Sequence, residues 1–442
     1  MSWRETTLGE ITDLKRGFDL PKSQRLQGDV PVYSSSGITG SNSTAAVEGP
    51  CVITGRYGTI GEVFFSGGPC WPLNTALYST EFNGNNPRFV YYLLQTIPWQ
   101  GYTTASAVPG VNRNHVNLCP VKIPDRATQD AIVEVLDSIV DKIALNNRLN
   151  DYLLDLLKSS AKNLYLKHEK NIQEKLPSGW RWVSIGEIAD MVCRGIAPKY
   201  SLESDEIILG QTCIRNNLVL TENGRSHAPK KLTDKWLRKY DLLINSTGVG
   251  SLGRTAQVWF EPSKLVVDSH VTIVRATDKK NALYLGSWAF EHERYIESLH
   301  TGSTGQTELP RDRVKAIRVV LPDAGTLDEF NAIAEPSVKM IVANQEENKR
   351  LIEIRDTLLP KLMSGAIDVS KVDLTQLTNN HLLVRGHNVP NRYWKEHLWK
   401  PSLIMFCHRC RTCSIRRSSN IWPKYSKSRY CQLRKHQRRR IC

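Results

Sequence analysis

The chain contains an internal repeat, and this repeat limits the folds that it can adopt more than any other feature. Residues 3–11 (WRETTLGEI) recur as residues 180–188 (WRWVSIGEI), and residues 54–61 (TGRYGTIG) align with residues 246–253 (STGVGSLG). The offset grows from 177 to 192 and then to 198, where Pro124 matches Pro322, so the second copy carries insertions in its first part. Copies of this length indicate duplicated domains, because the units of solenoid proteins are only ~20–50 residues long.

Each copy divides into a β-rich part and a helical part. Short β-branched and aromatic runs, broken by Gly, Pro, Ser and Asn, predict strands over 51–54, 62–65 and 75–78, and a helix is expected around 89–95. A long helical pattern follows Pro124, and either Asp125 or Thr128 can begin it. The predicted organisation is a first domain over 1–125, a helix over 126–170, a linker over 171–179, a second domain over 180–322, a second helix over 323–369 and a C-terminal extension over 370–442.

A heptad pattern runs along each long helix. Its positions are spaced alternately by four and three residues, which places them on one face of the helix. The polar members coincide in the two copies, since Asn146 matches Asn344 and Asn150 matches Asn348. An Asn in an apolar seam fixes the register of two helices because it must find another polar group. The residues expected to pair the helices are Ile132, Leu136, Ile139, Ile143, Asn146, Asn150, Leu153, Asn344, Asn348 and Leu351.

One alternative is that the two helices are unrelated and carry these Asn residues on their surfaces. The coincidence of the polar positions favours a shared seam. Pro336 and Pro360 fall inside the second helical pattern, which predicts that the second helix is kinked or interrupted and less regular than the first.

The net charge of +15 lies entirely in the C-terminal tail. Residues 384–442 hold 16 Lys and Arg against one acidic residue, Glu396, whereas residues 1–383 are neutral. The tail is either a nonspecific phosphate-binding extension or a segment translated in an altered frame; we favour the second interpretation and expect it to be disordered. The spacing Cys407-x-x-Cys410-x-x-Cys413 does not predict a zinc site, because no second Cys-x-x-Cys pair accompanies it.

The sequence offers no signal for a membrane or for secretion. It has no run of 18 apolar residues, and its N-terminus lacks the basic and then apolar order of a signal peptide. A cytoplasmic protein with no membrane partner is therefore expected.

Several short segments carry a family resemblance. They are residues 31–37 (PVYSSSG), 53–61 (ITGRYGTIG), 71–75 (WPLNT), 86–89 (NPRF), 112–114 (NRN) and 358–365 (LLPKLMSG). In this order, within a duplicated domain-plus-helix frame, they resemble the specificity subunits of Type I restriction–modification systems. The resemblance covers about residues 1–370, and the tail departs from it.

This resemblance implies an α+β protein with two tandem target-recognition domains, each followed by a long helix, the helices pairing as an antiparallel coiled-coil spacer. It also implies a non-catalytic subunit that binds double-stranded DNA, reads a bipartite asymmetric target, and docks two methyltransferase subunits and restriction subunits. No cofactor is expected in this chain; S-adenosylmethionine, ATP and Mg²⁺ would serve the partner subunits.

The length of the first helix agrees with such a role. Residues 129–158 would form a rod of ~45 Å, and half-sites on one face of DNA lie ~34–36 Å apart per turn. Two other functions stay open: a single-chain restriction–modification enzyme with its own catalysis, and a duplicated scaffold that binds only proteins.

Residues that read DNA should come from loops rich in Arg, Asn and Ser, because these side chains bond phosphates and base edges. The same residue types also form ordinary turns. The candidates in the first domain are Ser34, Ser35, Ser36, Arg56, Tyr57, Asn112, Arg113, Asn114 and His115. Those in the second domain are Arg194, Arg215, Asn216, Asn217, Thr247, Arg254, Gln306, Arg311 and Arg313.

Two motifs suggest catalysis but are incomplete. Residues 248–255 approach a P-loop, yet Arg254 stands where the phosphate-binding Lys is required, so a turn between strands is the better interpretation. Residues 86–89 (NPRF) approach an amino-methyltransferase motif, with Arg88 in place of its second Pro and no Gly-rich cofactor loop before it. We therefore predict no catalytic residue and no metal site.

Overall fold

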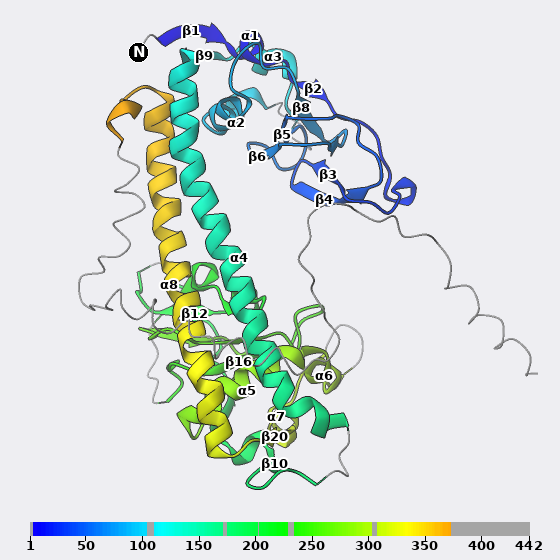
Figure 1. Cartoon of the computed structure of the whole chain (residues 1–442), viewed down its shortest axis with the longest axis vertical. Coiled ribbons are helices and arrows are strands. Elements are labelled where there is room, and N and C mark those ends of the chain that lie inside the picture. The colour runs from blue at the N-terminus through cyan, green and yellow to red at the C-terminus, as the bar shows by residue number, and fades with distance from the viewer. Residues whose placement is uncertain are drawn as a thin grey trace, which may run out of the picture. The chain divides into compact units, whose positions relative to one another are not determined.

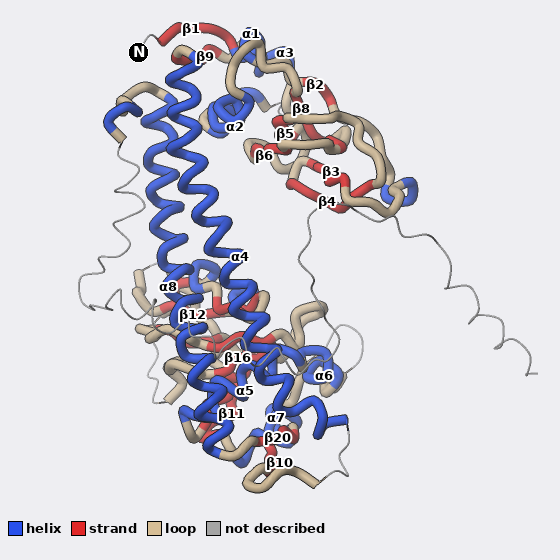
Figure 2. Tube along the Cα trace, in the orientation of Figure 1, coloured by secondary structure: helices blue, strands red, loops and turns tan. Residues whose placement is uncertain are grey.

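The structure is a computed structural model, which describes residues 3–103, 110–170, 175–201, 203–228, 234–302 and 307–372 (Figure 1). The expectations for the basic tail, including its disorder and its cysteine spacing, concern residues outside these ranges. Within them, the chain is a mixed α+β protein with two β-rich regions and two long helices, as expected from the sequence (Figure 2).

The first β-rich region contains three small sheets. The strands predicted over 51–54, 62–65 and 75–78 are present and belong to the four-stranded sheet of this region. The sheets have the orders β1–β9, β2–β8–β5–β6 and β4–β3–β7. Their strands are β1 (Trp3–Thr7), β2 (Lys15–Arg16), β3 (Val30–Ser34), β4 (Gly37–Asn42), β5 (Cys51–Gly55), β6 (Val63–Ser66), β7 (Trp71–Pro72), β8 (Ala76–Ser79) and β9 (Pro120–Pro124), accompanied by the helices α1 (Leu8–Ile11), α2 (Pro87–Gln95) and α3 (Arg113–Asn117).

The second β-rich region repeats the same three sheets. Their orders are β10–β20, β11–β19–β16–β17 and β15–β12–β18, and in both copies the third sheet joins one antiparallel pair to one parallel pair. The strands are β10 (Arg181–Ser184), β11 (Ala189–Arg194), β12 (Ile207–Leu209), β15 (Arg225–Ser226), β16 (Leu242–Asn245), β17 (Thr255–Gln257), β18 (Leu265–Val267), β19 (Val271–Ala276) and β20 (Arg318–Leu321), with the helices α5 (Lys279–Glu291), α6 (Glu293–Ser298) and α7 (Arg311–Ala316). The repeat found in the sequence is therefore a duplicated fold.

The insertion predicted for the second copy lies at the tip of one hairpin. In the first copy β3 and β4 are joined by a tight turn. In the second copy the corresponding strands β12 and β15 are separated by an extra hairpin, formed by β13 (Ile214–Arg215) and β14 (Leu218–Val219). The two copies therefore share their sheets and differ in a loop.

The long helices are α4 (Arg126–Lys170) and α8 (Ala324–Met363), which lie side by side along their lengths (Figures 1 and 2). Each starts after an Asp at the same position of the repeat. The Asp125 carboxylate accepts a hydrogen bond from the backbone N–H of Thr128, and the Asp323 carboxylate accepts one from Thr326. Of the two predicted starts of the first helix, the structure selects Asp125, whose side chain caps the first turn.

The helices run antiparallel, as predicted. The amide of Asn146 bonds Asn348 at 2.9 Å, and the amide of Asn344 bonds Asn150 at 2.8 Å, so positions later on α4 meet positions earlier on α8. All four side chains are buried. The shared seam is therefore confirmed, and the alternative of two unrelated helices is wrong.

The predicted interruption at the prolines is wrong, because α8 is one continuous helix through both Pro336 and Pro360, and the predicted kink stays a prediction. Both prolines lie on exposed positions, where water can bond the carbonyl oxygens that lose their partners. Pro360 also falls in the last turn, where few backbone bonds remain to be lost.

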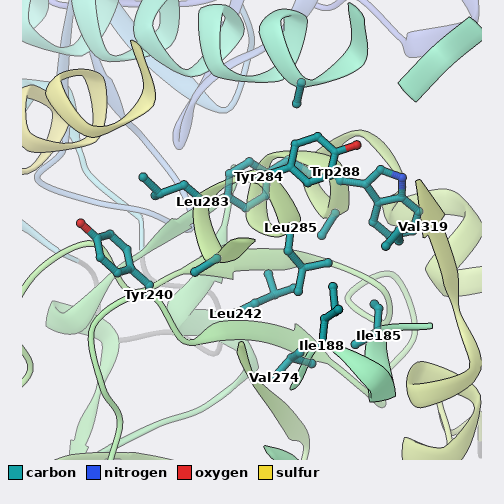
Figure 3. Packing of buried hydrophobic residues seen from close by; sticks show 14 of the residues in the cluster. Ile185, Ile188, Tyr240, Leu242, Val274, Leu283, Tyr284, Leu285, Trp288 and Val319 are labelled. Atoms are coloured by element: carbon teal, nitrogen blue, oxygen red, sulfur yellow. The ribbon is translucent and has the colours of Figure 1, made fainter. Parts of the chain in front are cut away.

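Both long helices contribute to the larger hydrophobic core of each β-rich region. The core of the first region includes Ile132 and Leu136 from α4 together with Leu362 and Met363 from the end of α8. The larger core of the second region surrounds Tyr284 and Trp288 of α5 (Figure 3). That core also takes residues from the second half of α4 and the first half of α8, among them Leu157, Tyr165, Phe330 and Ile341. The larger core of each β-rich region is therefore completed by the helix pair, whereas a smaller cluster in each region, around Ile53 and around Ile273, contains no residue of α4 or α8.

Among the described residues, no helix combines the length and the apolar character needed to cross a membrane.

Candidate functional site

The two copies present one equivalent loop, which lies between the central and the edge strand of each four-stranded sheet. In the first copy this loop follows β5, and Gly58 and Gly61 have φ angles of +78° and +95°. In the second it follows β16, and the matching Gly250 and Gly253 have φ angles of +73° and +84°. Glycine is suited to this region of φ, so the two loops share their backbone conformation at these two positions. They differ two residues earlier, where Gly248 has a φ of +90° and its counterpart Arg56 has no positive φ. The turn predicted in place of a P-loop is this second loop.

The first loop borders a basic pocket of about 780 Å³. Five of the predicted DNA-reading residues line it, namely Arg56, Tyr57, Asn112, Arg113 and Asn114. Lys15 and Arg16 of β2 line it as well, and the sequence analysis missed them. The adjacent basic pair was the available signal, but nothing in the sequence indicated that β2 would lie beside this loop.

Arg56 and Tyr57 form the wall of the pocket. The guanidinium of Arg56 lies 4.5 Å from the centroid of the Tyr57 ring, and the ring is 39% exposed. The ring also packs on Gly110, where an added Cβ would come within 2.5 Å of it. The Tyr57 ring is thus supported from one side and open to solvent, an arrangement suited to stacking on a base or covering a sugar.

Arg113 stands at the start of α3 and also lines the pocket. The side chain of Asn112 caps this short helix by accepting a hydrogen bond from the backbone N–H of Asn114 at 3.0 Å. Among the described residues, neither Arg113 nor Arg56 has a carboxylate within ion-pair distance, so both cations are available to an anionic ligand. His115 lies on the same helix and is exposed, but it does not line the pocket.

Ser34, Ser35 and Ser36 form the turn between β3 and β4, beside the first loop. The Ser34 hydroxyl bonds the backbone N–H of Ser36 and the carbonyl of Gly37, which makes it part of the turn. The Ser35 hydroxyl lies 3.5 Å from where a Cβ on Gly58 would stand. This turn therefore extends the same surface.

In the second copy, four predicted residues gather in a different pocket of about 650 Å³. Arg215, Asn216, Asn217 and Arg254 line it. Its other walls include Asp151 and Asp155 of α4, so its charge is mixed where that of the first pocket is basic.

The two asparagines of this pocket form the turn of the extra hairpin. Their φ angles, +52° at Asn216 and +61° at Asn217, are those of a two-residue hairpin turn. Asn217 is buried and donates to the Glu293 carboxylate at 2.9 Å, so it is already used inside the protein. Arg215 and Arg254 make no ion pair with a described residue and are the available cations.

Other candidates of the second copy have internal partners. Arg194 donates to the Glu308 carboxylate and to the Leu309 carbonyl, each at 2.8 Å, and thereby ties β11 to the segment before α7. The Thr247 hydroxyl bonds His270, and Arg313 donates to two carbonyls at the end of α6. Arg311 is exposed and lies 3.7 Å from the Asp312 carboxylate. Gln306 lies outside the described residues.

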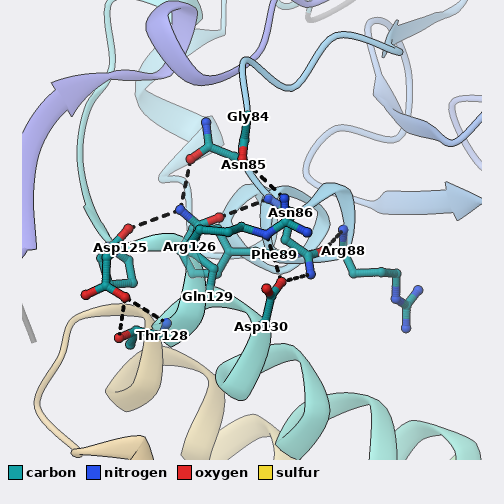
Figure 4. A network of polar contacts seen from close by, with 11 residues as sticks. Gly84, Asn85, Asn86, Arg88, Phe89, Asp125, Arg126, Thr128, Gln129 and Asp130 are labelled. Atoms are coloured by element: carbon teal, nitrogen blue, oxygen red, sulfur yellow. Dashed lines mark hydrogen bonds and ion pairs between the residues drawn. The ribbon is translucent and has the colours of Figure 1, made fainter.

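The NPRF segment joins α2 to the start of α4 (Figure 4). The Asn86 side chain accepts hydrogen bonds from the backbone of Arg88 and Phe89, which caps α2. Its amide donates to the Asp130 carboxylate at 2.6 Å, and Arg126 binds the same carboxylate. Hydrogen bonds from Arg126 and Asn86 hold the pKa of Asp130 below its ordinary value. The segment has a structural role that explains it without methyl transfer.

Arg88 of that segment anchors α2 more deeply. Its guanidinium lies 4.8 to 5.3 Å from the ring centroids of Phe65, Tyr91 and Tyr92. The same group forms an ion pair with Asp137 of α4, and the Tyr92 hydroxyl donates to that carboxylate at 2.5 Å. Cation–π contacts and a shared carboxylate therefore fix the first β-rich region on the helix pair.

The polar centre of the helix pair is larger than the four predicted asparagines. Asn146 also donates to the Glu347 carboxylate at 2.7 Å, and Asn348 donates to Asn147 at 2.8 Å. Lys142 lies 3.3 Å from the same Glu347 carboxylate. Glu347 and Asn147 fall outside the heptad positions, so the seam pattern did not include them. This network fixes the register of α4 against α8, and the helix pair carries one β-rich region towards each end.

Comparison with known proteins gives this geometry a context. Residues 1–154 match the family model of the Type I restriction modification DNA specificity domain. The chain is 22% identical over 310 residues to the specificity subunit of the Type I restriction enzyme MjaIX of Methanocaldococcus jannaschii, covering 64% of this chain and 70% of that protein. It is 19% identical over 460 residues to the HindI specificity subunit of Haemophilus influenzae, covering 83% of this chain and 99% of that protein.

The fold is also similar to a solved structure. The S subunit of a Type I restriction–modification system from M. genitalium aligns with a TM-score of 0.54 and 16% sequence identity. The alignment covers 82% of this chain and 96% of that subunit. Both β-rich regions and the helix pair therefore have a known architectural counterpart.

Proposed function

We propose that this chain is a member of the specificity-subunit family of Type I restriction–modification systems, that it reads a bipartite DNA target and that it is itself non-catalytic. The observation that carries the proposal is the duplicated loop on two copies of one sheet, held at the two ends of an antiparallel helix pair. Such an arrangement presents two similar readers at a fixed separation.

The separation suits two half-sites on one duplex. The α4 residues of the first core end at Leu136, and those of the second core begin at Leu154. At 1.5 Å per residue this stretch of α4 spans ~27 Å. One turn of DNA is ~34–36 Å long, and the loops of the two β-rich regions, which extend beyond the stretch, would cover the difference.

The two readers differ in the groups that they offer. The first loop carries Arg56 and Tyr57, where the second carries Gly248 and Val249, and the second copy adds the hairpin with Arg215. Unlike side chains on equivalent loops would select unlike base sequences, so the proposed target is asymmetric.

The charge balance supports a role within a complex. Residues 1–383 are neutral overall, and phosphate neutralisation supplies most of the affinity of DNA-binding proteins. We infer that two methyltransferase subunits and the restriction subunits increase the affinity of the complex for double-stranded DNA. S-adenosylmethionine, ATP and Mg²⁺ would be bound by those partners, and a cytoplasmic location follows from the function.

The decisive experiment is footprinting of the complex assembled with its methyltransferase subunits. Two protected half-sites separated by an unprotected gap are expected. A protein-binding scaffold would give no protected site, and methylation by the isolated chain would instead support a single-chain enzyme.

The basic pocket should read one half-site only. Replacing Arg56 and Arg113 with alanine should weaken binding by ~1–3 kcal/mol for each arginine that bonds a base edge. For each arginine that bonds a phosphate instead, the slope of the salt dependence should flatten by ~0.9. Competition assays with either half-site scrambled will measure this effect. Arg4→Ala, on an exposed position of β1, is the matched control and should change neither quantity. Equal reductions in affinity at both half-sites would contradict the assignment of the pocket to one reader.

The helix pair should set the gap between half-sites. An insertion of seven residues after Asn150 must be matched by seven directly before Asn344, because these two residues are hydrogen-bonded across the antiparallel seam and must stay at the same level. The longer pair should widen the recognised gap by about three base pairs, since seven residues add ~10 Å. Sequencing of the sites bound by the variant complex will measure the gap, and an unchanged gap would show that the helices do not determine it.

A further inference from the structure

The tip of the second loop carries an apolar side chain that the fold does not cover. Val249 is 86% exposed, more than any other large hydrophobic side chain among the described residues. It stands between Gly248 and Gly250, whose φ angles of +90° and +73° are suited to glycine. In the sequence alignment of the two loops, Val249 occupies the position of Tyr57. An apolar group at this place gains free energy only when a ligand covers it.

Internal hydrogen bonds hold this tip in place. The backbone N–H of Leu252 donates to the Gly248 carbonyl at 3.0 Å. The Gln211 amide donates to the Thr247 carbonyl, and it packs on Gly248 so closely that an added Cβ would lie 3.0 Å from it. Val249 is therefore presented at a defined place on the surface.

A hydrogen-bond donor of defined orientation lies beside the same loop. The Nδ1 atom of His270, an exposed residue, lies 2.8 Å from the Thr247 hydroxyl oxygen. The Gln211 amide nitrogen donates to that hydroxyl oxygen at 2.7 Å. Its identity as nitrogen follows from its bond to the Thr247 carbonyl, because a carbonyl can only accept. The hydroxyl keeps its own proton for Nδ1, so the proton of the neutral ring is on Nε2, where it can be donated to a ligand.

These two groups match the edge of one base. In the major groove, thymine presents the O4 acceptor beside its C5-methyl group. Guanine and adenine have acceptors there but no methyl group, and cytosine has an amino donor where thymine has O4. A donor at His270 and an apolar group at Val249 are therefore complementary to thymine and to none of the other three bases.

We infer that the second β-rich region contacts a thymine of its half-site, with Val249 on the C5-methyl group and the Nε2–H of His270 donating to O4. The inference rests on the function proposed above and names a base that this half-site must contain. Thr247 and Gln211 are positioning residues, since they act on the base only through the orientation of His270.

Base analogues that change one group at a time test the inference in the complex assembled with its methyltransferase subunits. The half-site concerned is the one still recognised when Arg56 and Arg113 are replaced. Exchanging each of its thymines in turn for deoxyuridine removes only the methyl group. One position should lose about fourfold in affinity, which corresponds to ~0.8 kcal/mol for one buried methyl group. In Val249→Ala that position should no longer distinguish thymine from uracil, because the contact is already missing.

Replacing the same thymine with 5-methylcytosine, opposite guanine, tests the donor separately, since this base keeps the methyl group and has an amino donor in place of O4. The wild-type complex should lose at least about fivefold in affinity, and His270→Ala should lose less, because no donor then faces the amino group. Leu118→Ala, at a side chain 70% exposed in the first β-rich region, is the matched control and should keep the wild-type response to both analogues. Unchanged affinity for the other half-site will show that each variant is folded and assembled.

Three results would overturn the inference and leave the proposed function intact. The first is a complex that protects both half-sites but responds to deoxyuridine at no thymine. The second is a uracil effect of equal size in the wild type and in Val249→Ala. The third is a folded Val249→Ala chain that no longer binds a methyltransferase subunit, which would assign the tip to a protein partner. A complex that protects no half-site would overturn both the inference and the proposed function.

Discussion

Replacing Arg275 with methionine is expected to lower the free energy of unfolding of the second domain by about 3–5 kcal/mol. Arg275 on β19 and Asp241, just before β16, form a two-bond ion pair at 2.7 and 2.8 Å, and their side chains are only 9% and 1% exposed. Methionine fills much of the same volume, but it leaves the Asp241 carboxylate charged and buried with no cation beside it. Denaturant unfolding followed by circular dichroism will measure the decrease.

Two further variants compare the contribution of this buried ion pair to stability with that of an exposed ion pair. Lys264→Met removes an exposed partner of Asp205, whose side chain is 72% exposed, and should cost no more than ~1 kcal/mol. Arg275→Met combined with Asp241→Leu should recover much of the stability, because both charges are then removed together. If Arg275→Met lowered the free energy of unfolding no more than Lys264→Met, water would be solvating the Arg275–Asp241 pair, and the pair would contribute less to stability than expected here.

A substitution near the end of α8 should destabilise the domain at the start of the chain. Leu362 is fully buried in the first core, so Leu362→Ala is expected to cost ~2–5 kcal/mol. Amide hydrogen exchange should therefore accelerate in β5 and α2, far away in the sequence. The same substitution near the start of the helix, Leu327→Ala, falls in the second core and should accelerate exchange in β16 and α5 instead. Faster exchange in the same domain for both variants would show that the cores do not divide α8 as described.

The sequence predicted the architecture because two strong patterns agreed. The repeat specified a duplicated fold, and the seam with Asn146 and Asn150 specified how the helices pair. Both depend on regular spacing, which survives when individual residues differ. The prolines were misjudged because their cost depends on whether the freed carbonyls meet water, and exposure is a tertiary property.

The site was predictable only in part. Arg56 and Arg113 were chosen for their residue type and lie in one pocket, since a strand end and a helix start meet there. Arg194 and Asn217 were chosen on the same grounds, yet their side chains already bond Glu308 and Glu293 of the same chain. Residue type cannot distinguish a side chain that contacts DNA from one that bonds another residue of the protein, because both roles need the same hydrogen-bond donors. The boundaries of the predicted domains stay predictions.

The division of the cores between distant parts of the chain has a consequence for synthesis on the ribosome. The first domain contains every one of its strands by Pro124, yet its core also needs Leu359, Leu362, Met363 and Val369. At ~5–20 residues per second, its last core residues emerge roughly 12–50 seconds after its last strand. Throughout that interval an apolar face of the nascent domain stays open, whereas the second domain can close soon after Ile341 emerges. The domain made first is therefore the one completed last, and a chaperone that shields exposed apolar surface would act on it for most of translation.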